Sequence, residues 1–104
     1  MPDTISSRER ARLKSRAHSL TPAVRIGQAG LTAAVLAEVD RALAALELIK
    51  VSVAVDDRKE RRAIGDALAD QVGATAVHRV GKILILWRPR RDGDSAVVVP
   101  PIDP

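Results

Sequence analysis

The sequence of 104 residues contains no cysteine, no phenylalanine and no tyrosine, and its only tryptophan is Trp87. The absence of cysteine excludes a disulfide framework, a thiolate metal site and a cysteine nucleophile. Because aromatic side chains are almost absent, the core must be built from Ala, Val, Leu and Ile. The length fits one domain with a single core and excludes two.

Long apolar runs are also missing. No stretch approaches the roughly 20 apolar residues that span a bilayer, and residues 1–10 lack the apolar run of a secretory signal. We therefore expect a cytoplasmic protein that does not associate with a membrane.

Basic charge is concentrated in two segments. Residues 1–30 carry a net charge of +4 and residues 58–91 carry +6, whereas the segments 31–57 and 92–104 each carry −3. Of the 17 basic residues 13 are arginine, whose planar fork suits phosphate. A general preference for Arg over Lys would account for the Arg content but not for the clustering, which favours a polyanionic partner.

Residues 6–20 have the pattern of a helix that begins with Ser6 or Ser7 as the N-cap. Its apolar positions are Leu13, Ala17 and Leu20. Arg8, Arg12 and Arg16 form one row at i, i+4 spacing, and Arg10 with Lys14 forms a second row, which we expect beside it. A solvated surface usually alternates signs, whereas Glu9 is the only acid here, so this helix is predicted to face an anion.

After the break at Thr21-Pro22, residues 23–26 are β-prone and lead into the glycine loop. Thr32 is expected to begin a second helix, with Val35, Val39, Ala42, Leu43 and Leu46 as its apolar stripe. Residues 48–55 alternate with period two, which predicts a strand with one buried side.

Asp56 or Asp57 is expected to cap a third helix that runs to Val72 and ends at Gly73. Residues 75–80 and 83–88 read as two strands joined by a tight turn, and the apolar run 83–87 indicates a central strand. The order αβαβαββ predicts a single α/β domain over residues 1–90. Residues 91–104 are rich in proline and without amphipathic period, and are predicted to form a disordered tail.

The residues offer little for catalysis. His18 and His78 have no second ligand at metal-binding spacing, so no metal or cofactor site is predicted. Asp56-Asp57 is the best carboxylate pair, and a helix cap accounts for it. We predict that the protein is not an enzyme and has no small-molecule substrate; a small hydrolase using Asp56, Asp57 or His78 is the weak alternative.

The stretch IGQAGLT places Gly27 and Gly30 between a predicted strand and a predicted helix. A G-x-x-G turn lets the backbone approach a ligand, and the helix N-terminus behind it offers free N–H groups to a phosphate. A plain turn also uses two glycines, but Arg25, the basic helix and Lys50 add charge nearby. Without an aromatic stacking platform, such a surface suits the backbone and shape of folded RNA.

Three stretches of the sequence resemble, in their order and spacing, the CRM (chloroplast RNA splicing and ribosome maturation) domain in its stand-alone bacterial form, the YhbY proteins. They are LKSRAHSLTPAVRIGQAGLT, ALAALELIKV and VGKILILWRP. The resemblance covers about residues 12–89. It implies a four-stranded mixed sheet with three helices, similar to the C-terminal domain of bacterial translation initiation factor three. It also implies RNA binding and association with precursors of the large ribosomal subunit.

Carried over by motif, the RNA-binding loop consists of Gly27, Gln28, Ala29 and Gly30. The resemblance adds Lys50 and the basic residues Arg8, Arg12, Lys14, Arg16 and Arg25. Two positions depart from the family pattern: Gln28 stands where a basic or small polar residue is common, and Trp87 stands where tyrosine is usual. We therefore expect a monomeric RNA-binding protein of ribosome assembly, with a protein-interaction module that reaches the ribosome through a ribosomal protein as the alternative.

Overall fold

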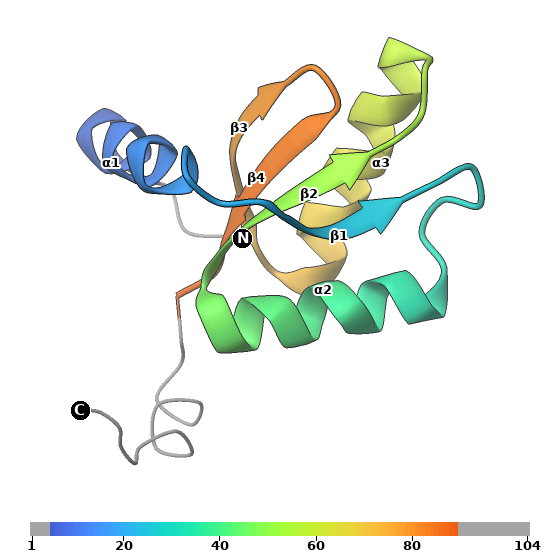
Figure 1. Cartoon of the computed structure of the whole chain (residues 1–104), viewed down its shortest axis with the longest axis horizontal. Coiled ribbons are helices and arrows are strands. Elements are labelled where there is room, and N and C mark those ends of the chain that lie inside the picture. The colour runs from blue at the N-terminus through green and yellow to red at the C-terminus, as the bar shows by residue number, and fades with distance from the viewer. Residues whose placement is uncertain (1–4, 90–104) are drawn as a thin grey trace.

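Three helices and four strands follow one another along residues 5–89, the part of the chain that this computed structural model describes (Figure 1). They are α1 (Ser7–Ala17), β1 (Pro22–Ile26), α2 (Ala33–Leu46), β2 (Leu48–Val53), α3 (Arg58–Val72), β3 (Thr75–Val80) and β4 (Ile83–Trp87). The predicted order αβαβαββ is confirmed. The predicted tail, residues 91–104, lies outside the described residues.

The strands form one mixed sheet in the order β1-β2-β4-β3. β1 runs parallel to β2, whereas β4 is antiparallel to both of its neighbours, β2 and β3. The apolar run 83–87 is therefore a central strand, as predicted. Ile26 pairs with Val53 at the end of the parallel pair, so the loops that follow β1 and β2 leave the sheet at the same end.

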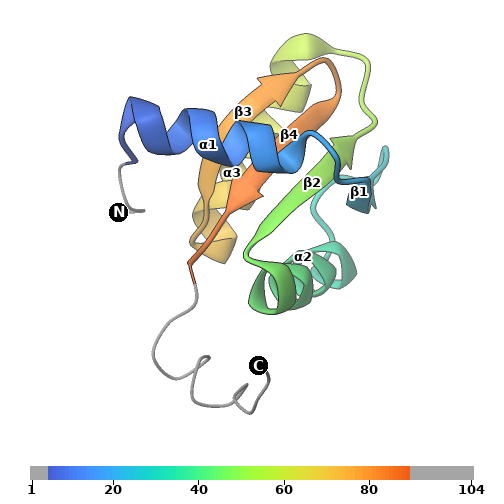
Figure 2. The same ribbon diagram turned by 60° about the vertical axis from the view of Figure 1, so that its left-hand side comes forward.

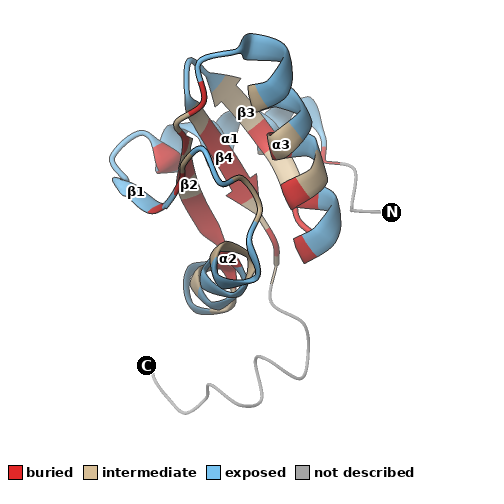
Figure 3. Ribbon diagram, turned by 90° about the vertical axis from the view of Figure 1, so that its right-hand side faces the viewer, coloured by how far each residue is buried: buried red, intermediate tan, exposed pale blue. Residues whose placement is uncertain are grey.

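Helices cover both faces of the sheet, with α2 and α3 on one face and α1 on the other (Figure 2). The larger apolar cluster joins α2 and α3 to all four strands, and the smaller joins α1 to β2, β3 and β4. Figure 3 shows the buried residues gathered in the sheet and along the inner side of α3. Since the side chains are aliphatic, burial of this apolar area supplies most of the stability.

The strand β2 differs from the prediction in two ways. It ends at Val53 rather than Val55, and its second face is covered in part by α1, which buries Leu48 in the smaller cluster. The predicted buried side of the strand carries Ile49 and Val51 and packs against α2 and α3. Period two showed which side chains share a face, but it could not show that a helix packs on the more polar face.

The helix caps follow the predicted residues with one exception. The side chains of Ser6 and Thr32 each accept a hydrogen bond of 3.1 Å from the backbone three residues on. Gly73 ends α3 with φ 65°, a conformation that glycine adopts without strain. Asp57 occupies the N-cap position of α3, but its side chain accepts no cap hydrogen bond, so the predicted capping role fits by position only.

Two leucines assigned to apolar stripes are exposed. Leu20 is 37% exposed because α1 ends at Ala17, before the Thr21-Pro22 break, and Leu46 at the last residue of α2 is 59% exposed. Helical spacing continues to the end of a helix, whereas the sheet beneath covers only its middle. Trp87 is half-buried against the smaller cluster.

Candidate nucleic-acid interface

The loop between β1 and α2 is a hydrogen-bonded turn. The Gly30 N–H donates to the carbonyl oxygen of Gly27 at 3.0 Å, and the side chains between them, Gln28 and Ala29, are exposed. Gly30 has φ 75°, where other residues are strained. Gly27 has an ordinary backbone conformation, and a Cβ there would meet only the Arg25 Nη1, at 3.8 Å. The backbone conformation therefore favours glycine at position 30, whereas position 27 could accept a side chain.

The first turn of α2 lies directly behind this loop. The first amides of a helix have no carbonyl partner within it. Thr32 satisfies the amide of Val35 with its side chain, which leaves the amides of Ala33 and Ala34 at the positive end of the helix dipole. The predicted arrangement of strand, G-x-x-G turn and helix N-terminus is thus present, and its chemistry suits a phosphate oxygen.

Arg25 lies in β1, beside the loop and on one face of the sheet. Val24 and Ile26 are buried in the larger cluster, so the alternation of the strand directs Arg25 to the opposite face, which carries α1. Its guanidinium lies near Gly27, since a Cβ added there would come to 3.8 Å from Arg25 Nη1. A ligand on the loop would therefore meet Arg25 from this face.

Lys50 lies on the same face but nearer to α1. It pairs with Pro22 at the start of β1, and its Nζ donates to the carbonyl oxygen of His18 at 3.4 Å, just beyond the end of α1. Arg25 pairs with Ser52 further along the same strands. Lys50 and Arg25 thus continue the positive charge of α1 toward the loop.

The two basic rows of α1 do not lie side by side, which corrects the expectation from spacing. Side chains two residues apart on a helix point about 200° apart, so Arg10 and Arg12 lie on different sides. The Arg10 guanidinium donates to the carbonyl oxygens of Val77 at 2.6 Å and Ala76 at 3.3 Å on β3. Arg8, Arg12 and Arg16 are exposed on the other side. Arg10 thus binds the edge of the sheet.

The structure brings some of the predicted site residues together and separates others. Arg25 lies at the loop, and Lys50 lies between the loop and the C-terminal end of α1. Arg8 and Arg12 are on the first turns of α1, which Figures 1 and 2 place away from the loop. The candidate surface is therefore an extended strip, and it does not form a single pocket.

Comparison with known proteins decides the family. The model of the CRS1 / YhbY (CRM) domain matches residues 5–88, nearly all of the described chain. This chain belongs to that family. The CRM domain here is 43% identical over 89 residues to a Haemophilus influenzae protein named "RNA-binding protein", covering 86% of this chain and 90% of the relative.

Two further matches agree. A Pseudomonas aeruginosa protein named "Probable RNA-binding protein" is 38% identical over 84 residues, covering 81% of each chain. A solution structure of a Staphylococcus aureus protein superposes with a TM-score of 0.75 at 22% identity, covering 86% of this chain and 93% of the other. That likeness shows that the two chains share a fold.

His78 of the CRM domain lies on β3 where α1 packs. Partial burial lowers the pKa of the His78 imidazole below its ordinary 6.5, and the positive charges of Lys14 and Arg10 lower it further. Because the folded pKa is below the unfolded one, this histidine contributes stability above about pH 6.5 that is lost as the pH falls toward its folded pKa. The pKa of His78 therefore responds to the positive charges of α1.

We expect Lys14→Gln to raise the pKa of His78, because one of the two neighbouring charges is removed. The ring proton shifts of His78 in an NMR pH titration measure this directly. Arg41→Gln, which removes a charge from an exposed site on α2, should leave the His78 pKa unchanged. A His78 pKa equally insensitive to both substitutions would contradict the assigned cause.

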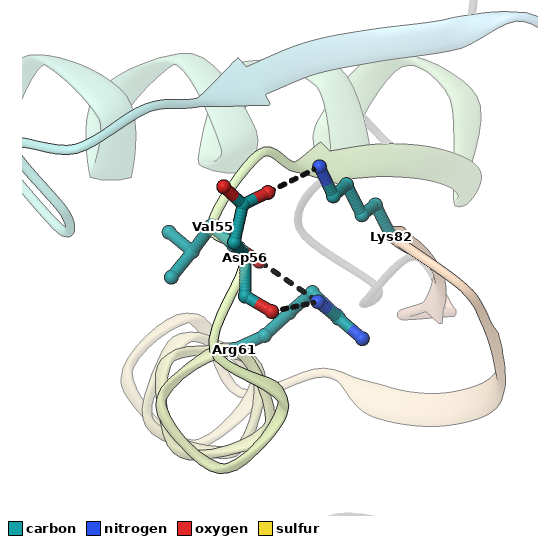
Figure 4. Close-up of polar contacts among 4 residues, drawn as sticks. All are labelled: Val55, Asp56, Arg61 and Lys82. Atoms are coloured by element: carbon teal, nitrogen blue, oxygen red, sulfur yellow. Dashed lines mark hydrogen bonds and ion pairs between the residues drawn. The ribbon is translucent and has the colours of Figure 1, made fainter.

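Asp56, half of the carboxylate pair, is engaged by a lysine. Lys82 donates to its Oδ1 at 2.8 Å (Figure 4), and this hydrogen bond together with the charge of Lys82 lowers the pKa of the Asp56 carboxyl. A general acid needs the opposite shift. Among residues 5–89, no group of three or more His, Asp or Glu side chains is placed to hold a metal ion.

Sequence reasoning missed a second group of cations. Arg58, Arg61 and Arg62 on α3 face Arg79 and Lys82 across a cleft of about 400 Å³. The net charge of +6 over residues 58–91 was the available signal, but spacing alone could not show that Arg79 lies near α3.

In the described part of the chain, no helix is long and apolar enough to cross a membrane.

Proposed function

We propose that this CRM domain binds RNA of the precursor large ribosomal subunit and assists its assembly in the cytoplasm, as a monomer and without catalysing a reaction. The observation that carries the proposal is the GQAG turn at the N-terminus of α2 with Arg25 against it. Membership of the CRM family and the names of the relatives support RNA as the ligand class. The ribosomal assignment comes from the resemblance to the bacterial YhbY proteins.

In this proposal Gly27 and Gly30 let the backbone reach a phosphate, and Gln28 donates a hydrogen bond from its exposed amide. The neutralising cations are Arg8, Arg12, Lys14, Arg16, Arg25 and Lys50. Since only half-buried Trp87 is aromatic, the recognition is of backbone and shape instead of stacked bases.

The test is a sucrose-gradient profile of lysate, probed for the protein across free, small-subunit, large-subunit and 70S fractions. We expect wild type to migrate with immature large subunits and a Gly27→Glu, Gln28→Glu variant to move to the free fractions, because two carboxylates would repel the phosphate. Both positions accept side chains: Gly27 has ordinary backbone and Gln28 is exposed. Gly30 is left intact because its φ of 75° would strain any replacement.

Gln71→Glu, the same change at an exposed site on α3, is the control and should migrate as wild type. Migration of the loop variant with the large subunit would refute the role of the loop. The alternative, a module that binds a ribosomal protein, predicts recovery of that protein after nuclease treatment of a pull-down. The RNA proposal predicts that nuclease abolishes the recovery.

A further inference from the structure

A cationic cleft lies on the face of the sheet opposite to α1. It has a volume of about 400 Å³ and is enclosed by the N-terminal half of α3 and the turn between β3 and β4. Val53, Ile83 and Leu84 give it an apolar base. Its basic lining residues are Arg58, Arg61, Arg62, Arg79 and Lys82, and no carboxylate lines it. We call it the α3 cleft.

Three of these cations are held in place by the protein. Lys82 donates to Asp56, Arg79 forms an ion pair with Asp66, and Arg61 donates to the carbonyl oxygens of Val55 at 2.8 Å and Asp56 at 3.2 Å (Figure 4). Among residues 5–89, two carboxylates form ion pairs with members of this group of five cations. These contacts restrain three of the five cationic side chains before a ligand binds, which lowers the ordering cost of binding.

Arg58 and Arg62 differ from the other three. Both are exposed, and within residues 5–89 the structure gives neither of them an ion pair or a side-chain hydrogen bond. They stand four residues apart on the first turns of α3, where like charges repel at i, i+4 spacing. A bound anion would relieve this repulsion.

A buried donor in the wall of the cleft also has no partner. The Nε–H of Arg79 is buried and makes no hydrogen bond to any described residue. A Cβ on Gly65 of α3 would come to 3.9 Å from this nitrogen and to 3.3 Å from Leu84 Cδ2, so the glycine permits close approach of α3 to the sheet here. An unsatisfied buried donor of this kind is rare in folded proteins.

The α3 cleft opens at the same end of the sheet as the GQAG loop. Ala54 N–H, just after β2, donates to Ile26 at the end of β1 at 2.8 Å, and Val53 N–H donates to Lys82 in the β3–β4 turn at 2.7 Å. These backbone hydrogen bonds join the ends of β1 and β2 to the β3–β4 turn. Figures 1 and 3 show the β1–α2 loop, the start of α3 and this turn at the same end of the sheet. Arg25 lies on the sheet face that carries α1, and the cleft lies on the opposite face.

We propose that the α3 cleft is a second site for the phosphodiester backbone of RNA, so that a strand held at the GQAG loop continues around the end of the sheet. This rests on the proposed RNA binding at the loop. Guanidinium forks suit phosphate oxygens, the apolar base suits a ribose, and the lining has no aromatic side chain that would stack a base. Another cleft, of about 480 Å³, is lined by Asp40 and Asp70 as well as Arg88, and its two carboxylates would repel phosphate.

The test compares single substitutions that each remove one exposed positive charge. Arg58→Gln and Arg62→Gln alter the cleft, and Arg41→Gln on α2 is the matched control. The probe is fluorescently labelled fragments of deproteinised large-subunit ribosomal RNA, titrated by anisotropy at several salt concentrations. Thermal unfolding of each variant checks that the fold is retained.

We expect each cleft substitution to reduce the slope of log affinity against log salt by about 0.8 and to weaken binding about sixfold at 0.1 M salt. Arg41→Gln should leave the slope unchanged. Cleft variants that behave as Arg41→Gln overturn the proposal.

Gln28→Glu, measured in the same series, separates the two sites. Weakening by Gln28→Glu alone leaves the loop proposal standing and removes the cleft. Weakening by the cleft substitutions alone supports the cleft and removes the loop. Wild type that binds no RNA overturns both.

An NMR titration with inorganic phosphate and AMP distinguishes a free anion from RNA. Shifts of the Gly65 and Gly81 amides that saturate with phosphate but are unaffected by RNA would overturn the assignment to the RNA backbone. Shifts at these amides with RNA that are lost in Arg58→Gln would support it.

Discussion

Between 0.05 and 0.2 M salt, the affinity of this protein for large-subunit ribosomal RNA is expected to fall roughly a thousandfold, because bound cations release condensed counterions. The cations are those of the loop and α1 surface, Arg8, Arg12, Lys14, Arg16, Arg25 and Lys50. For six contacts, the slope of log affinity against log salt is about −4 to −5.5. Fluorescence anisotropy titrations at four or five salt concentrations measure it.

Most of these cations are available without loss of internal structure. Arg12 is 3.6 Å from Glu9 in an exposed pair, which contributes little to stability. Arg8 and Arg16 are exposed and form no ion pair or side-chain hydrogen bond within residues 5–89, whereas Lys50 is half-buried and donates to His18. The contribution of Lys50 should therefore be the smallest of the six.

The double variant Arg12→Gln, Arg16→Gln should reduce the magnitude of this salt slope by about 1.5. Arg41→Gln is the control and should not change the slope. An affinity that stayed flat across this salt range would contradict phosphate recognition altogether. A steep salt slope that is unchanged in the double variant would show that the phosphate contacts are made by residues outside α1.

The parts of the fold that sequence predicted well are those set by local chemistry. Thr32 and Gly73 mark helix ends through hydrogen bonding and φ, which depend on neighbouring residues only. The alternation in residues 48–53 likewise depends on the pleat of a single strand. Leu46 and Leu48 were misjudged because their burial depends on where another element packs.

The same distinction separates the two candidate sites. Arg25 and Gly27 are two residues apart at the end of a strand, so their proximity follows from local geometry. The α3 cleft joins the start of α3 to Arg79 and Lys82, and only the antiparallel pairing of β3 with β4 brings these segments together. The net charge of residues 58–91 indicated that a second group of cations exists, but only the fold shows that these cations line one cleft.

Substitution of Arg88 should destabilise the fold without affecting RNA recognition, although it lies in the more basic segment. Arg88 is buried, with 9% of its surface exposed. Its Nη1 donates to the Asp40 carboxylate at 2.7 Å and to the Val72 carbonyl oxygen at 2.9 Å, and its Nη2 donates to the Asp40 carbonyl oxygen at 3.2 Å. It therefore joins the end of β4 to both α2 and α3.

We expect Arg88→Ala to reduce the free energy of unfolding by about 2–3 kcal/mol, since a buried carbonyl loses its donor and the packed stem is removed. The Asp40 side chain is 62% exposed and can be solvated, which keeps the loss below that of a fully buried pair. Urea unfolding followed by circular dichroism measures the change. Arg41→Ala, an exposed neighbour on α2, should cost less than about 0.5 kcal/mol.

Arg88→Met separates the two causes, because it keeps an apolar stem while removing the donors. It should recover part of the loss, whereas equal values for Ala and Met would assign the whole effect to hydrogen bonding. Corrected for the folded fraction, RNA affinity and its salt slope should equal those of wild type in both variants, since Arg88 is buried and engaged by the protein. A reduced salt slope would instead make Arg88 a phosphate ligand. Charge in the basic segments thus divides between arginines that hold the elements together and arginines that remain available to RNA.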